Sequence, residues 1–190
     1  MSSSIIRKDL PFTRNERHHE LGIQGEINVG KLLGDYFGVR NISYAMDGYS
    51  EGTNGYPDLI LKLNPPLAIE IKSMSTFVHR TRGDKTAKYI NYVPIVKDSW
   101  YNELAFAKSK KMKLILIVEI RLKDKGIYFW FDHEMLKPYL EKSDAQYAYV
   151  SIHDVMNKGN SLIYPDEIKY LEYWNYNTPL EDDKQNTLAV

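Results

Sequence analysis

"YPDLILKLNPPLAIEIKS", residues 56–73, consists of two short apolar runs on either side of an Asn-Pro-Pro segment. The runs Leu59 to Leu63 and Leu67 to Ile71 have the length and composition of strands, and the prolines between them are typical of a stiff turn. This predicts a hairpin. Three ionisable residues, Asp58, Glu70 and Lys72, nevertheless lie at one end of this hairpin, and charge is costly to bury unless it is paired or bound to a metal.

The turn sets the register of the predicted hairpin and gathers its charges. With the turn at Asn64, the numbers of paired residues sum to about 130, which brings Asp58 opposite Glu70 to Lys72. Glu70 and Lys72 are two residues apart on one strand, so they share a face. Converging carboxylates repel each other unless a cation lies between them, and oxygen ligands favour Mg²⁺ or Mn²⁺. The sequence therefore predicts a metal site that suits phosphodiester hydrolysis.

These motifs resemble those of the PD-(D/E)XK nuclease superfamily, which has a restriction-endonuclease-like fold. Pro57-Asp58 resembles the leading "PD", and Glu70-Ile71-Lys72 resembles "(D/E)XK". The segment "GIQGE", which ends at Glu26, is similar to the helix signature of archaeal Holliday-junction resolvases and related small nucleases. The resemblance covers roughly residues 20–120, and many members place a glutamine on the following helix, where this chain has Asn102 and Glu103.

The resemblance implies a role for each of these residues. Asp58 and Glu70 would bind Mg²⁺, with Mn²⁺ as a substitute, and the backbone carbonyl of Ile71 would lend a further oxygen. Lys72 would act on the nucleophilic water, and Glu26 would reach the metal directly or through water. The implied activity is metal-dependent endonucleolytic hydrolysis of duplex or branched DNA. Paired cuts imply a homodimer.

Several alternatives stay open. Within the enzyme class, the chain is either a structure-selective, junction-resolvase-like nuclease or a restriction-type one. An alternative from another class is a catalytically silent DNA-binding or interaction module with a nuclease fold. The three charges could also form a solvated ion pair on a surface hairpin. The second occurrence of similar letters, "YPDEIK" at 164–169, is interpreted as the charged start of a helix, favourable to its dipole.

The charge of the chain is unevenly distributed, although Lys and Arg balance Asp and Glu at 25 each. Residues 72–113 hold ten basic residues against three acidic ones, whereas residues 164–190 hold six acidic against two basic. A local basic segment suits a polyanion such as DNA. The predicted nucleic-acid-binding residues are Arg80, Arg82, Lys85, Lys88, Lys108, Lys110 and Lys111.

The pattern along the chain predicts one α/β domain, a central mixed β-sheet flanked by helices. Residues 1–19 are expected to form a flexible basic arm, 20–178 the nuclease domain and 179–190 a loose acidic tail. Helices are predicted at 20–37, from Asp98 or Ser99 to Lys111, from Asp132 to Leu140, and at 165–174. Besides the hairpin, strands are predicted at 113–120, 127–131 and 146–152, and a long loop is predicted at 73–97.

Composition excludes several other classes. There are no cysteines, so disulfides, thiolate zinc sites and cysteine nucleophiles are ruled out. The longest apolar run, residues 114–120, is too short to cross a bilayer, and the first ten residues lack the apolar segment of a signal peptide. The sequence contains no GxxxxGK[ST] loop, so nothing in it indicates a nucleotide cofactor. The expectation is a soluble, intracellular protein. The resemblance to small nucleases of the PD-(D/E)XK superfamily implies a kind of protein that viruses and mobile elements often carry.

Overall fold

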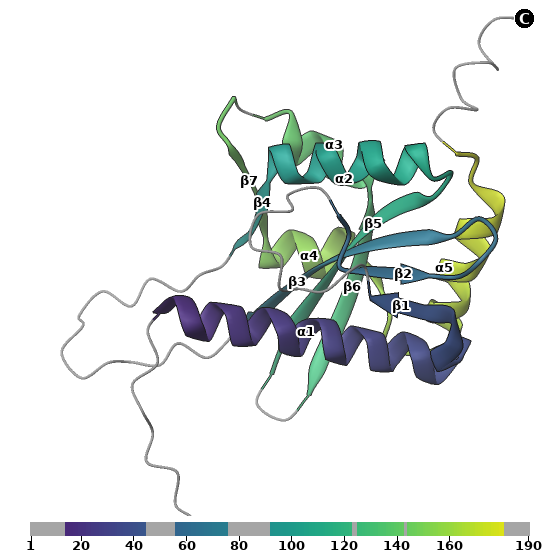
Figure 1. The fold of residues 1–190 in the computed structure, drawn as a ribbon. Coiled ribbons are helices and arrows are strands. Elements are labelled where there is room, and N and C mark those ends of the chain that lie inside the picture. Colours follow the sequence, from purple (N-terminus) through teal and green to yellow (C-terminus); the bar gives the residue numbers. More distant parts are fainter. Residues whose placement is uncertain (1–13, 45–55, 76–91, 123–124, 143, 181–190) are drawn as a thin grey trace, which may run out of the picture.

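The computed structural model describes residues 14–44, 56–75, 92–122, 125–142 and 144–180, and its centre is a six-stranded sheet (Figure 1). The strand order is β1-β2-β3-β5-β6-β8. The strands are β1 (Ile42–Tyr44), β2 (Leu59–Leu61), β3 (Leu67–Ser75), β5 (Lys113–Arg121), β6 (Gly126–Asp132) and β8 (Asn160–Ser161). β3 and β5 are parallel and the other pairs are antiparallel, so the sheet is mixed.

Helices cover both faces of this sheet, and a second sheet pairs two further strands. The helices are α1 (Arg14–Phe37), the short 3₁₀ helix η1 (Val39–Asn41), α2 (Lys97–Ser109), α3 (His133–Leu140), α4 (Ile152–Lys158) and α5 (Pro165–Asn177). β4 (Tyr92–Val96) and β7 (Tyr147–Ser151) form an antiparallel ribbon. The predicted architecture, a mixed sheet flanked by helices, is confirmed.

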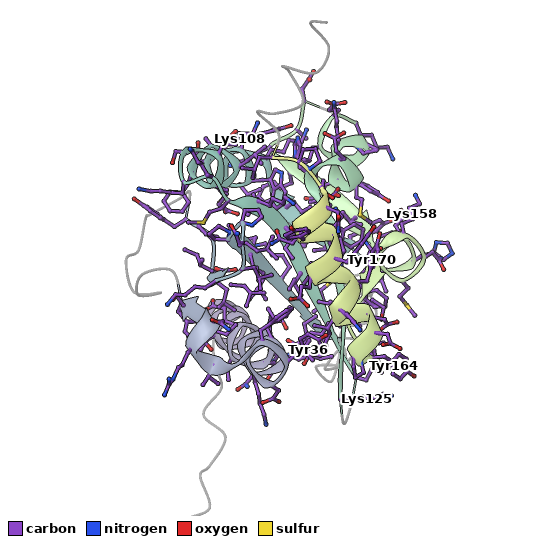
Figure 2. All side chains as sticks on the ribbon, turned by 90° about the vertical axis from the view of Figure 1, so that its right-hand side faces the viewer. Tyr36, Lys108, Lys125, Lys158, Tyr164 and Tyr170 are labelled. Carbon is purple, nitrogen blue, oxygen red and sulfur yellow. The ribbon has the colours of Figure 1, made fainter. Side chains whose placement is uncertain are left out.

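The central strands are buried on both faces, which divides the core in two. Leu114, Leu116 and Val118 of β5 point toward α2 and the β4–β7 ribbon. The alternate residues Ile115 and Ile117 point toward α1 and α5. In Figure 2, α5 (yellow) lies in front of the strands of the sheet. Burial on both faces explains why "KLILIVEI" is almost continuously apolar. By the same alternation, the even-numbered residues of β3 face the α2 side.

The long loop predicted for residues 73–97 is wrong at both ends. β3 continues to Ser75, and residues 92–96 form β4. Val93 and Ile95 are buried and their neighbours are not, so the strand has the expected period of two, but Pro94 obscures it. Proline is tolerated here because β4 is an edge strand. The predicted DNA-binding residues Arg80, Arg82, Lys85 and Lys88 lie outside the described residues.

Two helix boundaries also differ from prediction. α1 begins at Arg14, so the predicted arm is wrong from there on; "RNERHHE" contains no proline or glycine that would stop the helix, although its apolar pattern starts only at Leu21. α2 begins at Lys97, without a side-chain cap, and ends at Ser109. It ends in a Schellman turn in which Lys111 has a φ of 54° and the Met112 amide donates to the Ala107 carbonyl.

The remaining elements follow their sequence signals more closely. Asp132 caps α3 as predicted, and its side chain accepts a hydrogen bond from the Met135 amide at 2.8 Å. The short elements β1, α4 and β8 were not predicted, because two to seven residues carry little periodicity. Across the described ranges, no helix has the length and apolar character needed to span a membrane.

Candidate active site

The hairpin places Asp58 next to the strand that carries the other two charges. Asp58 comes directly before β2, and Leu59 pairs with Ile69, so Asp58 lies opposite Glu70. Its Oδ2 accepts a hydrogen bond from the backbone amide of Ile71 at 2.7 Å. That bond closes the ladder at the open end of the hairpin and fixes the carboxylate against β3.

Glu70 and Lys72 lie side by side on the face of β3 that points toward α2. The carboxylate of Glu70 is nearly buried, whereas the Lys72 side chain is 34% exposed. The Lys72 ammonium donates a hydrogen bond to Glu70 Oε1, which makes a charged pair at the rim of the core. The hairpin and the β3 alternation thus bring Asp58, Glu70 and Lys72 together.

The electrostatics of the site are those of carboxylates crowded together away from water. Burial and then the negative charge of Glu70 raise the pKa of Asp58 from 3.8 to about 8, against the opposing effects of Lys72 and the Ile71 amide. Burial alone would lower the pKa of Lys72, but the charges of Glu70 and Asp58 outweigh it and raise that pKa above its ordinary value. The lysine therefore stays protonated beside its two acidic neighbours.

A third carboxylate, Glu103, enters the site from α2. The buried residues of this helix are Trp100, Glu103, Leu104 and Ala107, a stripe at helical spacing in which one position is acidic. Ser99 Oγ donates to Glu103 Oε1 at 2.9 Å, while the buried Oε2 has no hydrogen-bond partner in the part of the chain that the structure describes. Burial and then the charge of Glu70 raise the pKa of Glu103 to about 8.

Glu103 was not a predicted site residue, although a signal was present. An acidic residue within the buried stripe of an amphipathic helix is unusual and indicates a paired or functional carboxylate. The helix places it over a cavity of about 40 Å³, enough for about one water molecule. The cavity is lined by Glu70, Lys72, Ile95, Val96, Ser99, Trp100, Glu103 and Leu116.

Glu26 lies on the opposite side of the sheet, on α1. Its charge raises the pKa of Asp58, but it is the last and weakest of the influences on that group. Two residues further along α1, Asn28 donates to Glu119 Oε1 at 2.7 Å, which ties the helix to β5. Gly25 allows the close approach, because a Cβ there would lie 2.8 Å from the Cβ of Ser73.

The donors at this site are oxygen atoms of the kind that Mg²⁺ and Mn²⁺ prefer. Two adjacent carboxylates, Asp58 and Glu70, fit a hard divalent cation, which commonly uses one or two protein carboxylates and fills its remaining positions with water. Among the described residues, no group of three or more His, Asp or Glu side chains is arranged to hold a metal ion. A cation at this point would thus rest on two carboxylates and on donors that are not acidic side chains.

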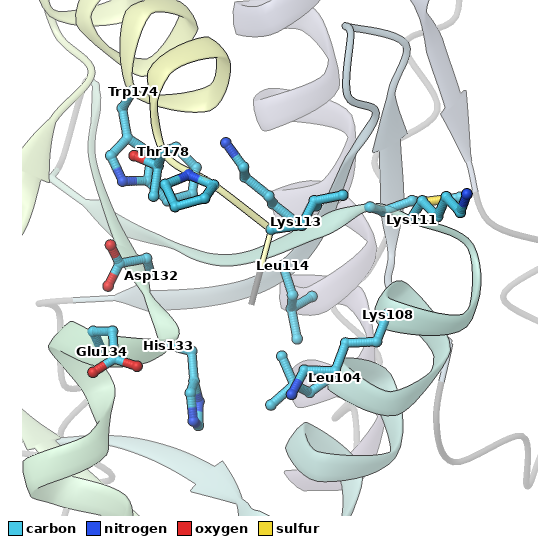
Figure 3. A pocket seen from close by; sticks show the side chains of 13 residues that line it. Leu104, Lys108, Lys111, Lys113, Leu114, Asp132, His133, Glu134, Trp174 and Thr178 are labelled. Carbon is cyan, nitrogen blue, oxygen red and sulfur yellow. The ribbon is translucent and has the colours of Figure 1, made fainter. Parts of the chain in front are cut away.

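The predicted basic residues of α2 lie at its other end. Lys108 and Lys111 line a larger cavity of about 330 Å³, shown in Figure 3, together with Lys113 and Trp174. The Lys113 ammonium donates to the backbone carbonyl of Asn175 and lies 5.0 Å from the centre of the Trp174 ring. Lys113 begins β5, so this cavity is removed along the sheet from Glu70 and Lys72.

The second motif-like segment, "YPDEIK", has the structure expected of a helix start. Glu167 Oε2 accepts hydrogen bonds from the backbone amides of Ile163 and Tyr164 at 2.7 and 2.8 Å. These bonds, with burial opposing them, lower the pKa of Glu167. The letters are the same as those of the hairpin, but here they cap α5.

Comparison with known proteins gives a likeness in structure alone. No protein-family model matches the sequence, and no curated protein matches it. Among solved structures, the chain is similar to Hjc, a Holliday junction resolvase from the archaeal hyperthermophile Archaeoglobus fulgidus. The TM-score is 0.50 at 14% sequence identity, and the match covers 73% of this chain and 93% of the resolvase. At this identity the likeness establishes the fold, a resolvase-like mixed sheet flanked by helices.

Proposed function

We propose that the chain is a divalent-metal-dependent deoxyribonuclease that cleaves DNA internally. The proposal is carried by one observation: Asp58, Glu70 and Lys72 converge at the open end of the β2–β3 hairpin, with the pKa of Asp58 raised to about 8. The fold shared with the Archaeoglobus resolvase supports it. The order of the "PD" and "EIK" motifs on that hairpin supports it as well.

In this proposal the carboxylates of Asp58 and Glu70, with the Ile71 carbonyl, hold Mg²⁺ or Mn²⁺. Their crowding favours a cation, because positive charge relieves the repulsion that raises the pKa of Asp58. When bound, the ion supplies Lewis-acid activation of a phosphoryl oxygen and lowers the pKa of a water molecule. Glu26, on α1, is proposed to support the same site through a water molecule and not as a direct ligand, because no third acidic side chain among the described residues is arranged to hold the ion.

Lys72 acts as a hydrogen-bond donor and a positive charge, not as a base, since its raised pKa keeps the side chain protonated. Its ammonium orients the attacking water and stabilises the negative charge that grows on a phosphoryl oxygen during in-line displacement. Glu70 holds that ammonium in place from the same face of β3. The partly exposed side chain of Lys72 leaves it accessible to a phosphodiester.

The proposed substrate is duplex or branched DNA, because the Archaeoglobus protein of similar fold is a Holliday junction resolvase. Junction-selective and restriction-type cleavage are both compatible with the site. Lys108, Lys110 and Lys111 at the end of α2 are proposed to contact backbone phosphates. A homodimer is proposed as well, since paired cuts in two strands need two sites.

A second candidate function, a catalytically silent DNA-binding module, is favoured by a separate observation. The Lys72 ammonium already neutralises Glu70, so part of the site is balanced in charge without a metal. Calorimetric titration with Mn²⁺, beside a nicking assay on supercoiled plasmid, separates the two functions. Metal binding with no cleavage of plasmid, junction, flap, duplex or single strand would favour the silent module.

The nuclease is tested by nicking of supercoiled plasmid in Mg²⁺. Glu70→Gln and Lys72→Ala are expected to abolish cleavage while DNA binding is largely kept. The matched control is Asp166→Asn in "YPDEIK", which changes the same kind of motif letter on α5 and is expected to leave cleavage unchanged. Cleavage by Lys72→Ala at the parent rate would refute the assignment.

A further inference from the structure

The β4–β7 ribbon carries a row of exposed tyrosines. Tyr92, Tyr147 and Tyr149 are 53, 41 and 56% exposed, although tyrosine is large and largely apolar. The alternate residues of the two strands, Val93, Ile95, Ala148 and Val150, are buried in the core beneath α2. The tyrosines therefore occupy the outward face of the ribbon.

The ring of Tyr149 contacts the rings of both other tyrosines. Tyr147 and Tyr149 are stacked, with ring centres 6.2 Å apart and planes at 26°. Tyr92 meets Tyr149 edge to face, with ring centres 6.4 Å apart. Apolar side chains scattered singly on a surface need no explanation, but a contiguous group is typical of an interaction site.

The register of the ribbon connects this row to the candidate active site. Tyr147 is directly opposite Val96 in the antiparallel pair, so the two side chains share a face. Val96 also lines the small cavity that contains Glu70 and Lys72. One end of the tyrosine row thus adjoins the wall of that cavity, and Tyr149 and then Tyr92 follow the ribbon away from it.

We propose that Tyr92, Tyr149 and Tyr147 stack the unpaired bases of a DNA strand whose phosphodiester enters the site at Glu70 and Lys72. This rests on the proposed function, since it takes DNA as the substrate. Unpaired bases expose flat faces that stack on aromatic rings, whereas the faces of paired bases inside a duplex are already covered. The row therefore selects DNA with a single-stranded segment over uninterrupted duplex.

The test compares binding of a labelled single strand and of the matched duplex, by fluorescence anisotropy in Mg²⁺. All proteins carry Glu70→Gln so that cleavage does not interfere. The test variant combines Tyr92→Ala, Tyr147→Ala and Tyr149→Ala, and a second variant places Phe at the same three positions. The control combines Tyr173→Ala and Tyr176→Ala, which are 64 and 75% exposed on α5, at the opposite edge of the molecule (Figure 1).

The alanine variant is expected to bind the single strand at least about tenfold more weakly, since base stacking on one aromatic ring contributes about 1–3 kcal/mol. Duplex affinity should change by less than about twofold. The Phe variant keeps the ring faces and should bind like the parent, as should the α5 control. Unchanged duplex affinity of the alanine variant itself shows that its loss of single-strand binding comes from the rings and not from misfolding.

Three results would overturn the proposal. One is unchanged single-strand affinity in the alanine variant, and another is an equal loss for single strand and duplex. The third is conversion of a dimer to a monomer by the alanine variant in sedimentation, with DNA affinity kept, which would assign the row to a second copy of the chain. A failed nicking assay refutes the nuclease alone, because this binding measurement does not depend on cleavage.

Discussion

Replacing Glu103 with glutamine is predicted to stabilise the metal-free protein at neutral pH. The buried carboxyl has a pKa of about 8, against an ordinary value of 4.5. Between these values the folded chain keeps a proton that the unfolded chain has lost, so the free energy of unfolding falls as pH rises. At about 1.4 kcal/mol per pH unit, the cost from pH 4.5 to pH 7 reaches about 3 kcal/mol.

Glutamine removes this cost because its amide does not ionise, and its oxygen can still accept the hydrogen bond from Ser99. The assay is urea unfolding of parent and Glu103→Gln in EDTA, at pH 5 and pH 7. The variant should gain about 3 kcal/mol over the parent at pH 7, and less than about 1 kcal/mol at pH 5, because pH 5 is only about half a unit above the ordinary pKa of 4.5.

The matched control is Glu172→Gln, an exposed glutamate on α5, which should change the free energy of unfolding by less than about 0.5 kcal/mol at both pH values. If parent and Glu103→Gln lost stability equally between pH 5 and pH 7, Glu103 would not hold a proton in the folded chain. The account of its burial beside Glu70 would then be wrong.

Two further predictions concern the packing of the helices, and urea unfolding checks both. Gly25→Ala should cost about 1–3 kcal/mol, because its Cβ would lie 2.8 Å from the Cβ of Ser73 and α1 would have to move. At Gly22 an added Cβ would meet no atom of another described element within 4 Å, so Gly22→Ala should instead gain about 0.5–1 kcal/mol. Equal effects of the two substitutions would contradict the close packing at Gly25. Asp132→Ala should cost about 1 kcal/mol because it removes the cap on the Met135 amide, and an unchanged midpoint would show that the cap contributes nothing.

Local sequence was sufficient for most of the scaffold around the site. The hairpin could be predicted because its turn, its apolar runs and its charges lie within eighteen consecutive residues. The buried strand β5 and the Asp132 cap of α3 also rest on signals from near neighbours in the chain. The start of α1 and the identity of β4 were mistaken, because a polar helical extension and a proline in an edge strand conceal the usual periodicity.

Sequence alone thus determined that an aspartate, a glutamate and a lysine share one end of a hairpin, since register and alternation within a hairpin are local properties. Tertiary structure decided the rest. Glu103 enters the site only because α2 packs over β3 and β5, and the tyrosine row exists only because β4 pairs with β7. The paired residues of β4 and β7 are 51 to 59 positions apart, and long-range burial, which no short pattern encodes, selects such contacts.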